Sequence, residues 1–241
     1  MPTASRPYHH GDLRSALVAA ALELARTEGP GGVSLREATR RAGVSPSAAY
    51  RHFRDRSHLL DAVARDIQER MAQRMRSAME ELGAETTAMM RDGGAELSEP
   101  GRRVADAERA LQRLRGVGLG YIGFALDEPG WFETAFFGRI PDDPPRADGA
   151  DGADGADGVD PGVTDGPSTP PPFALLAEAL DDCRRTGVLS PARRAGAEFV
   201  CWSAVHGCAE LVLHGPLRGA ERAFVQQLAA RVVEDIVAGI R

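Results

Sequence analysis

Apolar residues recur every three or four positions along most of the chain, which is the spacing of one face of an α-helix. The first such run ends at the Glu-Gly-Pro-Gly-Gly breaker of residues 28–32. Ser34 and Glu37 have the spacing of a capping box, which predicts a second, short helix that starts after Ser34 and ends at Gly43. Ser45–Pro46 predicts the start of a third helix that runs to about Phe53. The face of the first helix consists of Leu13, Leu17, Ala20, Ala21 and Leu24.

The same periodicity continues through the rest of the chain, and no segment shows the sustained alternation of a strand. A long fourth helix is predicted from about Ser57. Gly93–Gly94 and Pro100–Gly101 predict breaks, and another helix follows up to Leu126. Pro129–Gly130 then turns the chain into a group of aromatic residues. Further helices are predicted over residues 173–185, 191–213 and 217–240. The pattern therefore predicts an all-α fold.

Residues 141–172 consist mainly of Asp, Gly, Ala and Pro and include four tandem Ala-Asp-Gly units. Such a composition cannot bury a core and predicts a flexible loop. The clustered carboxylates raise the alternative of a calcium site, but the spacing lacks the alternate ligands and final Glu of an EF-hand. We expect two domains, a three-helix head over residues 1–56 and a larger helical body over 57–241.

The last predicted helix carries two neighbouring apolar stripes rather than one. Val225, Val233 and Val237 form the first of them. A face this wide on a terminal helix indicates packing on more than its own fold, and we expect a second copy of the chain there. The other stripe consists of Phe224, Leu228, Val232, Ile236 and Ile240.

Charge is distributed unevenly along the 241 residues, whose net charge is −6. Residues 1–60 contain nine Arg and five acidic residues, a net charge of +4, and the remainder is therefore acidic. A basic head on an acidic body indicates a polyanionic partner at one end only. All 29 basic residues are Arg. This could suit phosphate binding, but a GC-rich genome is the preferred explanation.

Several classes of protein are not indicated. No apolar run approaches the ~20 residues of a membrane-spanning helix, and the first residues lack the apolar stretch of a secretory signal. We therefore expect a cytoplasmic protein without a membrane partner. Cys183, Cys201 and Cys208 are too few for a disulfide framework and fit buried, reduced thiols. No catalytic grouping stands out, so we expect neither an enzyme nor a bound cofactor or metal.

Two short helices separated by Gly43–Val44 have the layout of a helix-turn-helix. In that motif the second helix enters the major groove of DNA and its first residues meet base edges. Spacing alone leaves open an ordinary helical hairpin.

The residues themselves strengthen the DNA-binding interpretation. Residues 34–60 read SLREATRRAGVSPSAAYRHFRDRSHLL, which closely resembles the DNA-binding domain of TetR-family regulators. That family carries a Val-Ser turn followed by Tyr-x-His-Phe and a basic residue. The resemblance implies phosphate contacts from Ser34, Arg36, Tyr50, His52 and Arg56. It implies base contacts from Ser45, Ser47, Ala48 and Arg51. Phe53 is expected to belong to the core.

The resemblance extends weakly into the body. Residues 121–129 resemble a helix end found in these regulators, and Trp202 with His206–Gly207 resembles the Trp-His-Gly class of their C-terminal domains. This implies a pocket for a small apolar ligand, although plain core packing of the same side chains is the alternative. The expected ligand-binding residues are Tyr121, Phe124, Trp131, Phe132, Phe136, Trp202 and His206.

The function that this resemblance implies is transcriptional repression by a homodimer. The dimer would bind a palindromic operator in double-stranded DNA, and a small-molecule effector would release it. Two alternatives stay open: a DNA-binding regulator without a ligand, and an enzyme with a vestigial head.

Two further motifs are weak. Residues 118–123, Gly-Leu-Gly-Tyr-Ile-Gly, match the dinucleotide fingerprint, but that motif needs a preceding strand, and a helix is predicted there. Small residues that permit close helix packing explain it better. Cys201, His206, Cys208 and Glu210 lie on different faces of one predicted helix, which argues against a zinc site.

Overall fold

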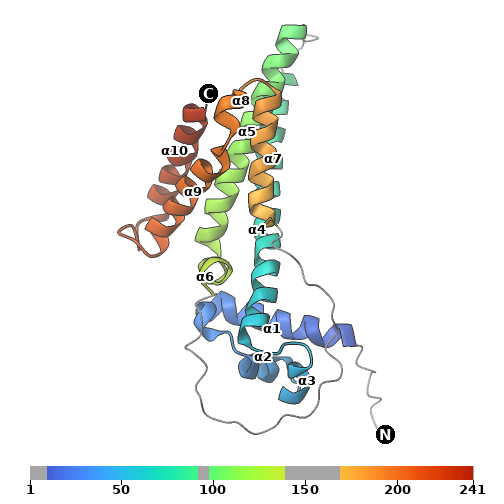
Figure 1. Ribbon diagram of the computed structural model, residues 1–241. Helices are drawn as coiled ribbons and strands as arrows, with labels where there is room; N and C mark the ends of the chain where they lie inside the picture. The colour runs from blue at the N-terminus through green and yellow to red at the C-terminus, as the bar shows by residue number, and fades with distance from the viewer. Residues whose placement is uncertain (1–9, 92–97, 139–168, 241) are drawn as a thin grey trace. The chain divides into compact units, whose positions relative to one another are not determined.

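The computed structural model describes residues 10–91, 98–138 and 169–240, and all regular structure in these ranges is helical (Figure 1). The all-α prediction is therefore confirmed. The helices are α1 (His10–Gly32), α2 (Leu35–Ala42), α3 (Pro46–Tyr50), α4 (Arg56–Arg91), α5 (Glu99–Asp127), α6 (Pro129–Phe137), α7 (Pro171–Arg185), α8 (Pro191–Arg194), α9 (Ala197–Leu213) and α10 (Arg222–Ile240).

The chain forms two compact units. The first contains the residues up to Ile67 and the segment that begins at Gly130, and the second contains Gln68–Pro129 and the residues from Thr169 on. Helix α4 contributes its first turns to the first unit and the remainder to the second. The functional division into 1–56 and 57–241 stays a prediction. Most of the loop predicted over 141–172 lies outside the described residues, and α7 already begins at Pro171.

The first unit is built around α1, which packs against α2 and α3. The helical run of α1 is interrupted at Gly29, whose φ of 67° is in the left-handed region. The core of this unit includes Leu17, Leu24 and Phe53, which are fully buried. Helix α6 is held to α1 by Trp131, whose indole N–H donates to the carbonyl of Leu22 over 2.8 Å.

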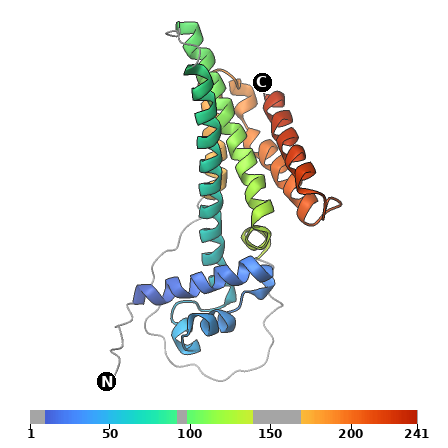
Figure 2. The same cartoon turned by 180° about the vertical axis from the view of Figure 1, so that it is seen from behind.

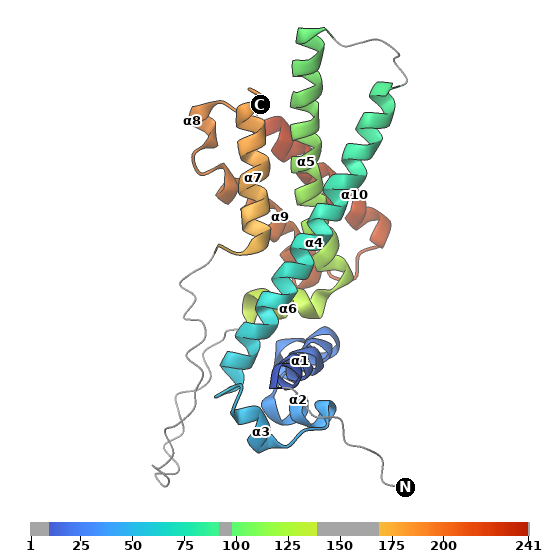
Figure 3. The same cartoon turned by 90° about the vertical axis from the view of Figure 1, so that its right-hand side faces the viewer.

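In the second unit α5 packs against α7, α9 and α10 (Figure 3), and α4 runs along another side of α5 (Figure 2). Three glycines of α5 allow these close approaches. A methyl group on Gly116 or Gly120 would lie 2.6 Å from the Cα atoms of Met79 and Met75, both in α4, and one on Gly118 would lie 2.8 Å from the side chain of Val233. Helix α5 is continuous through the glycine motif of residues 118–123, and the packing explanation holds for Gly118 and Gly120 but not for Gly123, which meets nothing closer than 3.8 Å.

Some helix ends differ from the predicted ones because local backbone geometry intervenes. Helix α3 ends at Tyr50, three residues early. The helix predicted over 191–213 is divided by Gly196, whose φ of 75° is left-handed. Pro100 occupies the first turn of α5 behind the N-cap Ser98 instead of breaking a helix. None of the helices in the described ranges is long and apolar enough to span a bilayer.

Candidate nucleic-acid interface and internal cavity

Helices α2 and α3 are each fixed at their first turn by a serine. The hydroxyl of Ser34 accepts from the backbone N–H of Glu37 over 3.1 Å, and that of Ser45 accepts from the N–H of Ala48 over 3.3 Å. Both residues have extended backbone angles, as N-caps do. These caps confirm the predicted starts of both helices and set the direction in which their N-terminal N–H groups point.

The turn between the two helices is closed by Gly43. Its φ is 67°, and its N–H donates to the carbonyl of Arg40. The N–H of Val44 donates to the carbonyl of Thr39 over 3.1 Å. Because a left-handed residue is needed here, glycine at position 43 is what allows the chain to turn so tightly.

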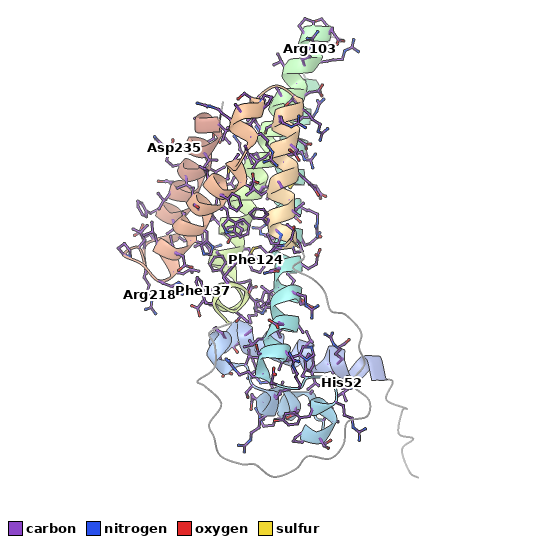
Figure 4. The ribbon with its side chains drawn as sticks, viewed as in Figure 1. His52, Arg103, Phe124, Phe137, Arg218 and Asp235 are labelled. Carbon is purple, nitrogen blue, oxygen red and sulfur yellow. The ribbon has the colours of Figure 1, made fainter. Side chains whose placement is uncertain are left out.

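Polar side chains of α3 and its end project into solvent. Ser47, Tyr50 and Arg51 are exposed, Tyr50 at 59%, whereas Ala48 and His52 are half-buried. Figure 4 shows His52 next to α3. Arg36 on α2 is exposed as well. The predicted DNA-binding residues of this region thus belong to α3, its N-cap and the two residues after it, and to the start of α2.

Phe53 and Arg56 are anchored inside the first unit. Phe53 is fully buried, as predicted, with the guanidinium of Arg14 5.3 Å from its ring centroid. The Nε atom of Arg56 donates to the carbonyl of Val33 over 2.8 Å, and its Nη2 atom donates to that of Pro30 over 2.6 Å. Arg56 therefore ties the first turn of α4 to the segment that precedes α2.

Charge on α2 is partly compensated. Hydrogen bonding to Arg40, with a further contribution from Arg41, lowers the pKa of Glu37 to about 2, against the opposing effect of desolvation. Arg41 also pairs with Glu28 over 3.0 Å. The carboxylate of Glu37 thus bonds to arginines of its own helix, whereas Arg36 and Arg51 are exposed.

An internal cavity lies in the second unit. Its volume is about 20 Å³, room for little more than one water molecule. Tyr121 and Trp202 line it, together with residues of α4, α5, α7, α9 and α10 that the sequence did not indicate. Aliphatic members of the lining include Leu114, Val117, Leu176, Val205, Val233 and Val237.

Two of the predicted ligand-binding residues, Tyr121 and Trp202, line this cavity, and a third, His206, bonds to Tyr121. The Tyr121 hydroxyl and His206 Nδ1 are hydrogen-bonded 2.8 Å apart. The ring of Tyr121 contacts that of Trp202 edge to face, with centroids 4.9 Å apart. Burial raises the pKa of Tyr121, and the charge of Glu210 raises it further. Burial lowers the pKa of His206 below 6.5, opposed by Glu210. Both partners are therefore neutral at pH 7.

The other predicted ligand-binding residues do not line this cavity. Phe124 is buried on α5 (Figure 4). Trp131, Phe132 and Phe136 belong to the first unit, where Arg26 lies over the Trp131 ring and the centroids of Phe132 and Phe136 are 5.0 Å apart. The seven aromatic and histidine positions thus divide between the two units.

The cysteines are all buried and free, as expected. Burial raises the pKa of Cys183 and of Cys201 to about 11. No group of three possible metal ligands occurs in the part of the chain that the structure describes.

Comparison with known proteins places this geometry in a family. Residues 17–63 match the model of bacterial regulatory proteins of the tetR family, and residues 114–236, about half of the chain, match the tetracyclin repressor-like C-terminal domain. No curated protein matches the sequence.

Solved structures share the fold over nearly the whole chain. A protein of unknown function from Rhodococcus sp. RHA1 is 25% identical, with a TM-score of 0.62 and coverage of 98% of this chain and 99% of that one. A protein described as regulatory, SCO4313, is 20% identical, with a TM-score of 0.52 and coverage of 98% and 100%. One described as a TetR-family transcriptional regulator from Mesorhizobium loti MAFF303099 is 15% identical, with a TM-score of 0.50 and coverage of 96% and 98%. Taken with the capped helix-turn-helix, the two family matches show that the chain belongs to the TetR family of DNA-binding transcriptional regulators.

Proposed function

We propose that the protein is a repressor that binds a palindromic operator as a homodimer and is released by a small apolar ligand. The observation that carries the DNA-binding part is the exposed polar face of α3, which Gly43 and the Ser45 cap hold in a fixed direction. A short helix presented in this way fits the major groove, where its first residues reach base edges.

Each predicted contact has a role in this proposal. Ser45, Ser47, Ala48 and Arg51 read bases, and Arg51 can form a bidentate pair with guanine. Ser34, Arg36, Tyr50 and His52 contact phosphates, with the N-terminus of α2 adding its own N–H groups. Arg56 supports the phosphate contacts indirectly, because its hydrogen bonds to the carbonyls of Val33 and Pro30 fix the segment that precedes α2.

Homodimerisation is supported by the surface of α10. Val225, Ala229, Val233 and Val237 are buried against the second unit. In the neighbouring stripe Phe224 is 50% exposed and Leu228, Val232 and Ile240 are half-buried, whereas Ile236 lines the cavity. An apolar stripe of this kind on a terminal helix suits an isologous interface with a second copy. Two recognition helices then read two half-sites, which gives the specificity that one cannot.

The proposed effector site is the cavity of the second unit. Val233 and Val237 of α10 line it, so a molecule that enlarges it acts on the helix proposed to bind the second subunit. Release from DNA requires only that the effector bind one dimer geometry more tightly than the other. The proposal assigns no catalytic step to the chain and places it with its DNA in the cytoplasm.

The size of the cavity favours a second candidate, a regulator whose body serves assembly alone. A volume of about 20 Å³ is far below the ~300 Å³ of a typical small-molecule site. The two candidates differ in one measurement, whether any bound compound changes the affinity for operator DNA.

The DNA-binding part is tested by selecting bound fragments from a random double-stranded pool at near-physiological salt. We expect enrichment of a palindrome with half-sites about one helical turn apart. Tyr50→Ala is the control and should reduce recovery. If no sequence is enriched and Tyr50→Ala behaves as the parent does, the head does not recognise a specific DNA sequence.

A further inference from the structure

The cavity lining is mostly aliphatic, and Tyr121 and Trp202 are its aromatic members. Side chains from α5, α7, α9 and α10 such as Val117, Leu176 and Val237 cover most of the wall. The lining side chains that carry a polar group are Tyr121, Trp202 and Cys201. A molecule inside would therefore be held mainly by apolar contact and could be oriented by a polar group at only one end.

The hydroxyl of Tyr121 belongs to a neutral hydrogen-bonded pair that has a negative charge near it. The Tyr121 hydroxyl is bonded to His206 Nδ1, and both groups are neutral at pH 7 for the reasons given above. Glu210, one turn further along α9, bonds to His214 through Oε2, while its Oε1 atom is buried without a hydrogen-bond partner. This carboxylate repels an anion. Glu210 does not line the cavity, so a cation inside would lose its hydration without a charged group in contact with it.

An unbroken series of aromatic contacts leads from Tyr121 to the surface. Trp202 contacts Tyr121 on one side and Phe173 on the other, with the Trp202 and Phe173 centroids 5.5 Å apart. Phe173 in turn lies 5.7 Å from Phe199, which is 64% exposed. Trp202 itself is half-buried. It lines the cavity and stands between Tyr121 and Phe173 in this series.

We propose that the cavity takes an uncharged, largely apolar molecule with one hydroxyl or carbonyl group, which hydrogen-bonds to the Tyr121–His206 pair after Trp202 turns aside. The neutral pair can either donate or accept, because the tyrosine hydroxyl does both and the imidazole has two tautomers. Movement of Trp202 supplies the volume that the closed cavity lacks. The inference rests on the effector site of the proposed function and adds the chemical class of the effector and its anchor.

The test uses the full-length protein and matched probes. The panel consists of uncharged alcohols and ketones of about ten carbon atoms, a size suited to small pockets. Each has a hydrocarbon, a carboxylate and an ammonium counterpart of the same shape. Tryptophan fluorescence reports binding, and Trp202→Phe, which keeps Trp131, should abolish the response. We expect saturable responses to alcohols or ketones. Affinities should be about tenfold lower for the hydrocarbons, as loss of one hydrogen bond implies, and lower also for the carboxylates and ammonium ions, which lose hydration in the apolar cavity.

Two variants examine the anchor. Tyr121→Phe and His206→Gln should lower the affinity for the alcohols and ketones about tenfold and leave the affinity for the hydrocarbons unchanged. His214→Gln, on the same helix, is the matched control and should change neither. Equal affinities in the parent and in Tyr121→Phe would overturn the inference. So would stronger binding of an ion, or the absence of any response to the uncharged probes.

Failure of this inference is distinguishable from failure of the proposed function. Operator affinity is measured with and without the best probe. A probe that binds beside Trp202 without changing operator affinity would refute effector release and leave the ligand class standing. Intact operator binding with no response to uncharged probes would overturn the ligand class alone.

Discussion

Arg51 and Tyr50 are neighbours at the end of α3, yet their proposed roles predict different losses. Arg51→Ala should relax base preference at one position and cost about 1–3 kcal/mol on the preferred sequence only, because it removes a base contact. Tyr50→Phe should weaken specific and random DNA equally, because a phosphate carries no sequence information. Binding titrations on both kinds of DNA at several salt concentrations measure the difference. Equal loss on both for Arg51→Ala would contradict its role in reading bases.

Arg56 is expected to stabilise the head as well as serve DNA binding. Arg56→Ala removes the side-chain donor to the carbonyl of Val33 and one of two donors to the carbonyl of Pro30, which also accepts from the N–H of Val33. Leaving them without these partners should lower the free energy of unfolding by about 1–3 kcal/mol and weaken binding to every DNA sequence. Urea denaturation and DNA titration measure the two effects. Arg54→Ala is the control, since the Arg54 side chain is 85% exposed, and its stability should stay near the parent value.

His206 should make stability depend on pH in mildly acidic solution. Burial lowers its pKa in the folded protein, despite the nearby Glu210, so the unfolded chain binds the proton more readily. Stability is therefore expected to fall as the pH drops below about 6.5, the pKa of an unperturbed histidine. His206→Gln should lose this part of the pH dependence, while His214→Gln, which removes an exposed imidazole, should keep it. Identical stability profiles for the parent and His206→Gln would refute this linkage.

Residues with local partners could be predicted from the sequence, and residues with distant partners could not. Ser34 and Ser45 cap a backbone N–H three positions away, a relation that the sequence itself displays. The carbonyl partners of Arg56 lie 23 and 26 positions away. The resemblance accordingly predicts a phosphate contact for Arg56. Its hydrogen bonds to the backbone carbonyls are visible only in the structure.

At the scale of helices, the apolar periodicity located most helices but did not show which helices pack against one another. The sequence predicts one helix over residues 191–213, and the structure has two. The left-handed backbone of Gly196 separates α8 from α9. The glycines of α5 were predicted to allow close packing, but which helix meets each of them follows from the arrangement in space. Gly116 and Gly120 meet α4, and Gly118 meets α10.

Two glycines of α5 should therefore respond in opposite ways to the same substitution. Gly120→Ala places a methyl group 2.6 Å from the Cα atom of Met75, where backbone cannot yield cheaply, and should destabilise by about 1–3 kcal/mol. Gly123→Ala meets only the far end of Arg74, at 3.8 Å, and should stabilise by about 0.5–1 kcal/mol, since alanine favours a helix. Urea denaturation measures both. A stable Gly120→Ala variant would show that α4 and α5 do not approach so closely.

At the scale of the whole molecule, the class of protein was predictable and the cavity was not. The short DNA-binding motif is contiguous, so its residues could be recognised together. The cavity is lined from five helices spread between Met75 and Val237. Aromatic content alone grouped Trp131 with Trp202, although the two belong to different units. Composition cannot tell an aromatic side chain that lines a cavity from one that fixes a helix, as Trp131 does through Leu22.

Assembly of the proposed dimer depends on the apolar stripe of α10 that contains Phe224 and Leu228. Leu228→Glu would bury an unpaired carboxylate in the interface and should weaken self-association at least about a hundredfold, the equivalent of roughly 3 kcal/mol. Gln226→Glu adds the same charge to an exposed residue off the stripe and should leave association unchanged. Sedimentation measures the dimer, and operator titration should show affinity falling with it, because a monomer reads a single half-site. A Leu228→Glu protein that stays dimeric would place the interface elsewhere on the molecule, and one that becomes monomeric while keeping full operator affinity would show that a single copy suffices for recognition.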